Sequence, residues 1–129
     1  MTAMLEGIRV LVVEDEFLVA TLIEEMLQSA GCVVSGPIAR VAEALDAVDH
    51  ESYDAAVLDV NLGGDRIDPV ADALSRQHIP FMFVTGYNTG GLPRYAARPH
   101  LCKPFKTADL IGKLMGLVKT VTPKPGLAD

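Results

Sequence analysis

Two kinds of hydrophobic pattern alternate along this chain. In the first, mostly apolar residues follow one another in a short run, which is typical of a buried β-strand. Such runs occur at residues 8–13, 32–35, 54–59, 79–84 and 99–102. In the second, apolar residues recur every three or four positions, which predicts an amphipathic helix. This spacing occurs over residues 17–29, 41–48, 68–77 and 110–118.

This alternation of strands and helices predicts an α/β fold. Strands joined by helices run parallel, and their crossovers are right-handed, so the expected architecture is a doubly wound five-stranded parallel sheet with helices on both faces. In such sheets, ligands bind at the carboxyl ends of the strands. Candidate functional residues are therefore sought directly after each strand.

Two of the predicted helices carry further local detail. Residues 17–29 hold apolar residues at spacings of three and four, which predict an amphipathic helix; they are Leu18, Leu22 and Met26, and Ile23 and Leu27. Residues 68–77 begin with Asp68, which is expected to cap the helix, and with Pro69 in the first turn.

The segment between the fourth and fifth strands departs from the alternation. Residues 85–98 contain three glycines and Pro93, which are poor residues for a helix interior. We therefore expect a shortened or irregular fourth helix, with at most a turn or two within residues 93–97.

Composition is consistent with one globular domain and argues against nucleic acid and membranes as partners. The chain has 129 residues, of which 50% are hydrophobic and 22% charged, as in ordinary folded domains. Its net charge of −6 argues against nucleic acid as a partner. It has neither an apolar stretch of membrane-spanning length nor a signal peptide, so we expect a cytoplasmic protein with no membrane partner. Cys32 and Cys102 are interpreted as buried thiols rather than as a disulfide.

Side chains that could bind a ligand or take part in a reaction stand at the ends of four predicted strands. Glu14 and Asp15 follow the first, Asp59 ends the third, Thr85 follows the fourth and Lys103 follows the fifth. If these strands are neighbours, three carboxylates, a hydroxyl and an ammonium group meet at one edge of the sheet. Clustered carboxylates repel one another unless a cation lies between them, and hard oxygen ligands suit Mg²⁺. A lysine and a hydroxyl suit a bound phosphoryl group, and a carboxylate can accept that group as a nucleophile.

The motifs VVEDE, VLDVNL, FVTGY and CKPF stand in this order, each at the end of a strand. With them the chain resembles the receiver domains of response regulators in two-component signalling. The resemblance spans residues 6–119, and residues 120–129 are expected to form a frayed tail. It implies a flavodoxin-like strand order of 2-1-3-4-5 and a cis peptide bond before Pro104. FVTGY also resembles the motif of a receiver subgroup called FAT GUY, whose members are often single-domain and atypical in the region of the fourth helix.

The resemblance implies a role for each matching position. Asp59 is expected to accept a phosphoryl group from the phosphohistidine of a sensor histidine kinase or a histidine phosphotransfer protein. Asp15 and Asp59 are expected to bind Mg²⁺ directly, together with the backbone carbonyl of Asn61. Glu14 is expected to act through a metal-bound water.

The resemblance also implies phosphoryl contacts and a switch. Thr85 is expected to hydrogen-bond one phosphoryl oxygen and Lys103 to pair with another. Switching is expected to involve Thr85, Tyr87 and His100, where His100 replaces the aromatic residue usual in the family. Residues 86–97 are expected to form the switch surface and to be the least ordered part of the domain before phosphorylation.

Together these expectations describe a stand-alone receiver that is not an enzyme in the ordinary sense. Mg²⁺-dependent self-phosphorylation and slow autodephosphorylation are expected, with output through protein contacts or phosphate shuttling. An excised domain of a longer protein is an alternative. Two other functions remain open: a pseudo-receiver that binds partners without being phosphorylated, and a phosphatase of the haloacid dehalogenase type. The phosphatase motif has a second acid where this chain has Asn61.

Overall fold

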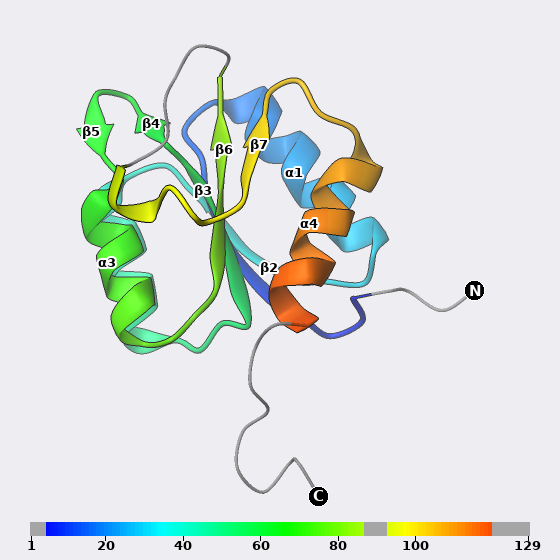
Figure 1. Ribbon diagram of the computed structural model, residues 1–129, viewed down its shortest axis with the longest axis horizontal. Coiled ribbons are helices and arrows are strands. Elements are labelled where there is room, and N and C mark those ends of the chain that lie inside the picture. The colour runs from blue at the N-terminus through cyan, green and yellow to red at the C-terminus, as the bar shows by residue number, and fades with distance from the viewer. Residues whose placement is uncertain (1–4, 87–92, 120–129) are drawn as a thin grey trace, which may run out of the picture.

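The centre of the fold is a parallel sheet of five strands. The computed structural model describes residues 5–86 and 93–119. Its main sheet has the order β2-β1-β3-β6-β7, which confirms the expected order 2-1-3-4-5 for the successive long strands (Figure 1). These strands are β1 (Arg9–Val13), β2 (Val33–Ile38), β3 (Ala55–Asp59), β6 (Phe81–Thr85) and β7 (His100–Cys102).

Helices cover both faces of this sheet, as the alternation predicts. They are α1 (Phe17–Ser29), α2 (Val41–His50), α3 (Asp68–Arg76) and α4 (Thr107–Lys119). Figure 1 shows α1 and α4 together on one side of the sheet and α3 on the other, and α2 packs beside α3. Among the described residues, no helix combines the length and apolar character needed to cross a membrane.

The central strands β3 and β6 are the most firmly packed part of the sheet, because both of their faces are buried. All five residues of β3 are buried, and so are all five of β6. Val57 packs into the cluster under α1 and α4, whereas Leu58 packs into the cluster under α2 and α3. Full burial of such a side chain is worth about 1.5–3 kcal/mol. The carboxyl ends of β3 and β6 are therefore fixed by packing on both sides.

The apolar residues of α1 divide between the core and the surface. Ile23 and Leu27 are fully buried against the sheet, as expected. Leu18 and Leu22 are 71% and 52% exposed, and Phe17 is 78% exposed. The prediction of an amphipathic helix is confirmed: Met26 packs at the margin of the core, whereas Leu18 and Leu22 lie outside it, since only one side of α1 faces the sheet.

The connection between β6 and β7 is irregular where it is described. A single 3₁₀ turn, η1 (Pro93–Tyr95), stands in place of a longer helix, which agrees with the turn or two expected within residues 93–97. Tyr87 and the rest of residues 87–92 lie outside the described residues. The expectation that residues 86–97 are the least ordered part of the domain stays untested.

A small hairpin that the pattern does not predict follows the third long strand. It pairs β4 (Asn61–Leu62) with β5 (Asp65–Arg66) in antiparallel fashion. Gly63 and Gly64 form its turn with φ of 59° and 92°, a region that favours glycine. The hairpin follows Asp59 directly and so borders the carboxyl edge of the sheet.

Three local expectations need correction. Strand β2 runs on through Gly36 and Pro37 to Ile38 instead of ending at residue 35. Asp68 is the first residue of α3 rather than its cap, and its carboxylate binds Arg66. Cys32 is buried as expected, but Cys102 is exposed, because it lies at the end of an edge strand. Both thiols are free.

The extension of β2 depends on Gly36, and we expect Gly36→Ala to destabilise the protein by about 3 kcal/mol. Gly36 has a φ of 101°, and an added Cβ would lie 2.7 Å from the carbonyl oxygen of Val12 and 2.8 Å from the amide nitrogen of Ile38. Urea unfolding monitored by circular dichroism measures the loss.

The matched control is Gly112→Ala on the exposed side of α4, where an added Cβ meets nothing within 4 Å. This change should be neutral or slightly stabilising, because alanine favours helix more than glycine does. Equal unfolding midpoints for the two variants would contradict the role given to Gly36.

Candidate functional site

The sheet brings the predicted site residues to one edge. Glu14 and Asp15 follow β1, Asp59 and Thr85 are the last residues of β3 and β6, and Lys103 follows β7. These strands are parallel neighbours, so their carboxyl ends lie together, toward the top of Figure 1.

Three carboxylates meet at this edge. Glu14, Asp15 and Asp59 each offer an oxygen, and these oxygens all lie within 4.8 Å of one another. Glu14 is 2% exposed and Asp59 4% exposed, whereas Asp15 is exposed to solvent. The arrangement places two carboxyl groups out of water and a third at the opening.

Burial changes the acidity of the buried pair. Burial, together with the neighbouring Asp59, raises the pKa of Glu14 from 4.5 to about 7. Burial also raises the pKa of Asp59, although the backbone N–H of Asn61 donates to its Oδ1 at 3.1 Å and Lys103 opposes the rise. In the absence of a cation, the site therefore favours holding a proton.

Lys103 partly offsets this negative charge. Its Nζ lies 3.2 Å from Glu14 Oε1 and 3.7 Å from Asp59 Oδ2. Burial lowers the pKa of Lys103, but the charges of Glu14 and Asp59 outweigh burial and raise it overall. The backbone also fixes this lysine, because its N–H donates to the carbonyl of Thr85 at 2.7 Å. The Lys103–Pro104 bond is cis, as the resemblance implies.

The donor set fits a hard divalent cation such as Mg²⁺. Glu14 Oε1 is buried and accepts no well-directed hydrogen bond from any residue that the structure describes, and ionised carboxylates offer only acceptor oxygens. The space beside the cluster is kept clear by Gly63, where an added Cβ would lie 3.0 Å from Asp15 Oδ2. An open hollow here is lined by Asp15, Glu16, Asp59, Asn61, Gly63, Gly86 and Lys103. Nothing in the hydrophobic pattern of the sequence indicates this clearance.

The residues expected to switch are only partly placed. Thr85 is 7% exposed at the end of β6. His100 is half-buried on β7, with its ring 5.1 Å from that of Phe83. Its Nδ1 lies 2.7 Å from the carbonyl oxygen of Arg98 and so acts as the donor. Its Nε2 is buried and has no hydrogen-bond partner among the described residues. Tyr87, the third expected residue, is outside the described part of the chain.

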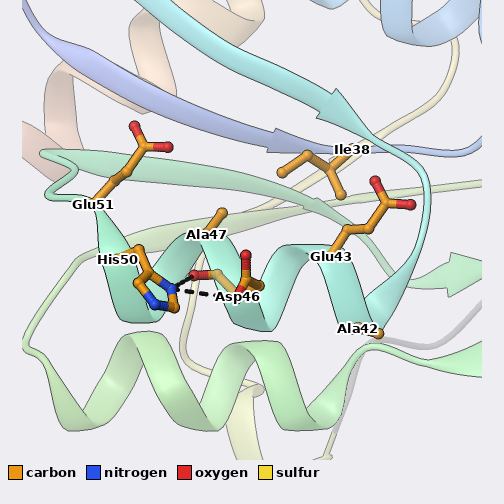
Figure 2. Close-up of a pocket in the computed structure, with 7 residues that line it drawn as sticks. All are labelled: Ile38, Ala42, Glu43, Asp46, Ala47, His50 and Glu51. Carbon is orange, nitrogen blue, oxygen red and sulfur yellow. Dashed lines mark hydrogen bonds and ion pairs between the residues drawn. The ribbon is translucent and has the colours of Figure 1, made fainter.

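A separate hollow over α2 lacks this chemistry. Figure 2 shows that it lies beside the edge strand β2, with His50 turned toward Asp46. His50 Nδ1 lies 2.9 Å from the Asp46 carbonyl oxygen, and this hydrogen bond and the Asp46 carboxylate raise the pKa of His50. Among the described residues that line this hollow there is no lysine or threonine. The carboxyl edge of the sheet is therefore the candidate site.

Comparisons with known proteins agree with this geometry. The family model described as "Response regulator receiver domain" matches residues 10–115. The solution structure of SdrG from Sphingomonas melonis Fr1 is 39% identical with a TM-score of 0.80, and the match covers 92% of this chain and 99% of that one. The receiver domain of sensor histidine kinase PA1611 from Pseudomonas aeruginosa PAO1 is 25% identical with a TM-score of 0.77, covering 88% and 99%, and its crystal structure holds a magnesium ion in the active-site cleft.

A curated relative is longer than this chain. Transcriptional regulatory protein TcrA from Mycobacterium tuberculosis is 36% identical over 118 residues. The match covers 86% of this chain but 46% of TcrA, so the chain spans about half the length of that relative.

The raised pKa of Glu14 predicts that this group makes the protein less stable as the pH rises, the reverse of what a carboxyl with a lowered pKa does. A carboxyl whose pKa rises from 4.5 to about 7 on folding binds its proton more tightly in the folded state. Stability from this group is therefore fully present below pH 4.5 and is lost as the pH rises through about 7. In EDTA, we expect the wild type to lose about 1–3 kcal/mol relative to Glu14→Gln across this window.

Urea unfolding at a series of pH values measures this difference. Asp65→Asn removes an exposed carboxylate from the β4–β5 hairpin. Its free energy of unfolding should change with pH as that of the wild type does. Parallel pH profiles for the wild type and Glu14→Gln would show that Glu14 does not hold the proton.

Proposed function

The chain belongs to the response-regulator receiver domain family, and we propose that it accepts a phosphoryl group on Asp59 from a histidine kinase or a histidine phosphotransfer protein. The observation that carries this proposal is the position of Asp59. Its carboxylate ends a strand that is buried on both faces, lies at an open hollow and has an ammonium group 3.7 Å away.

The proposed reaction moves one phosphoryl group between two nucleophiles. An oxygen of the Asp59 carboxylate attacks the phosphorus of a phosphohistidine, so that the new O–P bond forms as the N–P bond breaks. The imidazole of the donor leaves with the electron pair of that bond. The product on this chain is an acyl phosphate, which water can later hydrolyse to restore Asp59.

Neighbouring residues would stabilise the transferred group. Lys103 reaches the edge of the hollow with its ammonium group, and Thr85 ends the adjacent strand. Charge spreads over the equatorial phosphoryl oxygens during transfer, and an ammonium group and a hydroxyl placed beside them lower the barrier. The cis bond before Pro104 is consistent with the family pattern around Lys103.

A divalent cation completes the proposed site. Asp15, Asp59 and the backbone carbonyl of Asn61 would hold Mg²⁺, with Glu14 acting through a bound water. The ion supplies positive charge that offsets the carboxylates and the phosphoryl oxygens. The magnesium ion in the cleft of the PA1611 receiver domain supports this choice of metal.

The phosphodonor must contact the surface around Asp59, and α1 offers an apolar one. Phe17, Leu18 and Leu22 are large exposed side chains on the helix that follows Asp15. Exposed apolar patches of this kind mark protein contact sites. A shallow apolar hollow continues from α1 to the start of α4 and reaches Lys103; it is lined by Glu16, Val19, Leu22, Met26, Gly86, Lys103, Pro104 and Phe105.

The proposal also covers the mode of output, the receiver subgroup and the cellular location of the protein. We propose that output is through protein contacts or phosphate shuttling, for which the exposed apolar side chains of α1 offer a contact surface. The motif FVTGY and the single turn η1 support placement in the FAT GUY subgroup. Free Cys32 and Cys102 are consistent with a reducing cytoplasm.

The test of the phosphoacceptor is Asp59→Asn. After incubation with acetyl phosphate and Mg²⁺, intact-mass spectrometry should show one added phosphoryl group on the wild type and none on Asp59→Asn, because the amide is not a nucleophile. EDTA should also prevent the addition. Asp65→Asn serves as the control and should be modified like the wild type.

Three results would contradict the proposal. An unmodified wild type would favour a pseudo-receiver, and continued turnover of phosphoesters would favour a phosphatase. Full modification of Asp59→Asn would place the acceptor elsewhere.

A further inference from the structure

A group of ionic contacts joins η1 to helix α3. The hydroxyl of Tyr95 donates to a carboxylate oxygen of Asp72, and Arg94 Nη2 lies 3.0 Å from the same oxygen. Arg94 Nη2 also lies 3.5 Å from Asp68 Oδ2. The bond from Tyr95 lowers the pKa of Asp72. These contacts attach η1 to the first two turns of α3.

Asp68 has a second arginine partner on the other side. Arg66, at the end of the β4–β5 hairpin, contacts it through Nε at 3.1 Å and through Nη2 at 3.1 Å. Arg66 and Arg94 therefore share one oxygen, Asp68 Oδ2. We call the three residues Arg66, Asp68 and Arg94 the Asp68 bridge. Because the two guanidinium groups share this oxygen, a shift of one arginine changes the strength of the ion pair between Asp68 and the other.

The hairpin carries the bridge back to the phosphoacceptor. Arg66 stands opposite Asn61 in the β4–β5 pairing. The backbone N–H of Asn61 in turn donates to Asp59 Oδ1 at 3.1 Å. A continuous series of contacts thus runs from the Asp59 carboxylate, through the hairpin and Asp68, to Arg94 in η1.

The turn η1 is also seated on the strand that ends in Thr85. The ring of Tyr95 lies 5.3 Å from that of Phe81 and 6.3 Å from that of Phe83, both in β6. The guanidinium carbon of Arg98 lies 4.3 Å from the Phe81 ring centroid, a distance at which cation–π attraction operates. Any change in the bridge therefore alters how η1 sits on β6.

We propose that the Asp68 bridge transmits phosphorylation of Asp59 to η1, so that η1 is a readout surface controlled through α3. This inference rests on the proposed function, since it takes Asp59 as the phosphoacceptor. It adds a route through α3, which is separate from the switching role expected for Thr85 through its own bond to the phosphoryl group.

The first link of the series must respond when Asp59 is modified. A phosphoryl group on Asp59 converts one carboxylate oxygen into the bridging oxygen of an acyl phosphate and adds negative charge beside it. The bond from the Asn61 N–H then changes, and Asn61 is the residue paired with Arg66. Arg66 is 80% exposed and Arg94 60% exposed, and exposed ion pairs are individually weak. A small displacement of the hairpin is therefore enough to redistribute the two arginines on Asp68.

The test uses the full chain labelled with ¹⁵N, titrated with beryllium fluoride in the presence of Mg²⁺. The amide of Asn61 reports binding at the site, and the amides of Ala96 and Arg98 report on η1, because they donate to Pro93 and Tyr95. In the wild type, all three amide signals should shift. In Asp68→Asn, the Asn61 shift should persist while the shifts of Ala96 and Arg98 fall at least twofold.

Two further variants make this result specific. Arg94→Gln removes the η1 end of the bridge without changing α3 or the hairpin, so it should give the same loss and serves if Asp68→Asn folds poorly. Glu51→Gln breaks an exposed ion pair of similar length, 3.2 Å to Arg9, and should leave all three shifts at wild-type size.

Contradictory outcomes are distinguishable. Wild-type-sized shifts of Ala96 and Arg98 in Asp68→Asn or Arg94→Gln would overturn the bridge. So would a wild type in which Asn61 shifts but Ala96 and Arg98 do not; in both cases the phosphoacceptor assignment would stand. A wild type with no shift at Asn61 would overturn the proposed function and the bridge together.

Discussion

The structure depends on keeping two carboxylates out of water beside one lysine. Glu14 and Asp59 are nearly fully buried at the end of the sheet, and Lys103 lies within 4 Å of both. One ammonium group cannot offset two buried charges, so burial raises the pKa of both acids. The sheet tolerates this arrangement because β3 is packed on both faces. The imbalance favours a proton in the metal-free state and would favour a divalent cation together with a phosphoryl group in the reactive one.

Much of this site could be predicted because it follows from chain topology. Parallel strands place their carboxyl ends at one edge, so Asp59, Thr85 and Lys103 could be expected together from their positions after apolar runs. The strand order was implied by the resemblance rather than by hydrophobic spacing, and the sheet confirms it. The break in the helical pattern at residues 85–98 likewise reflects local chemistry, since glycine and proline disfavour helix wherever they stand.

The features that could not be predicted depend on which neighbour each residue meets. Leu18 and Ile23 have the same helical spacing signal, but only Ile23 faces the sheet. Asp68 has the residue type of a helix cap, yet it binds two arginines that come from a hairpin and a 3₁₀ turn. Nothing in the sequence pattern gives the clearance that Gly63 leaves beside Asp15. Periodicity predicts elements, whereas these contacts depend on how elements distant in sequence come together.

The central claim is that Asp59 forms an acyl phosphate, and chemical trapping tests it most directly. Borohydride reduces an aspartyl phosphate to homoserine and leaves free carboxylates unchanged. After treatment with acetyl phosphate and Mg²⁺, reduction and proteolysis, peptide sequencing by mass spectrometry should find homoserine at position 59 alone. Homoserine at Asp15 or Asp65, or none at any position of a protein that has gained a phosphoryl group, would contradict the account.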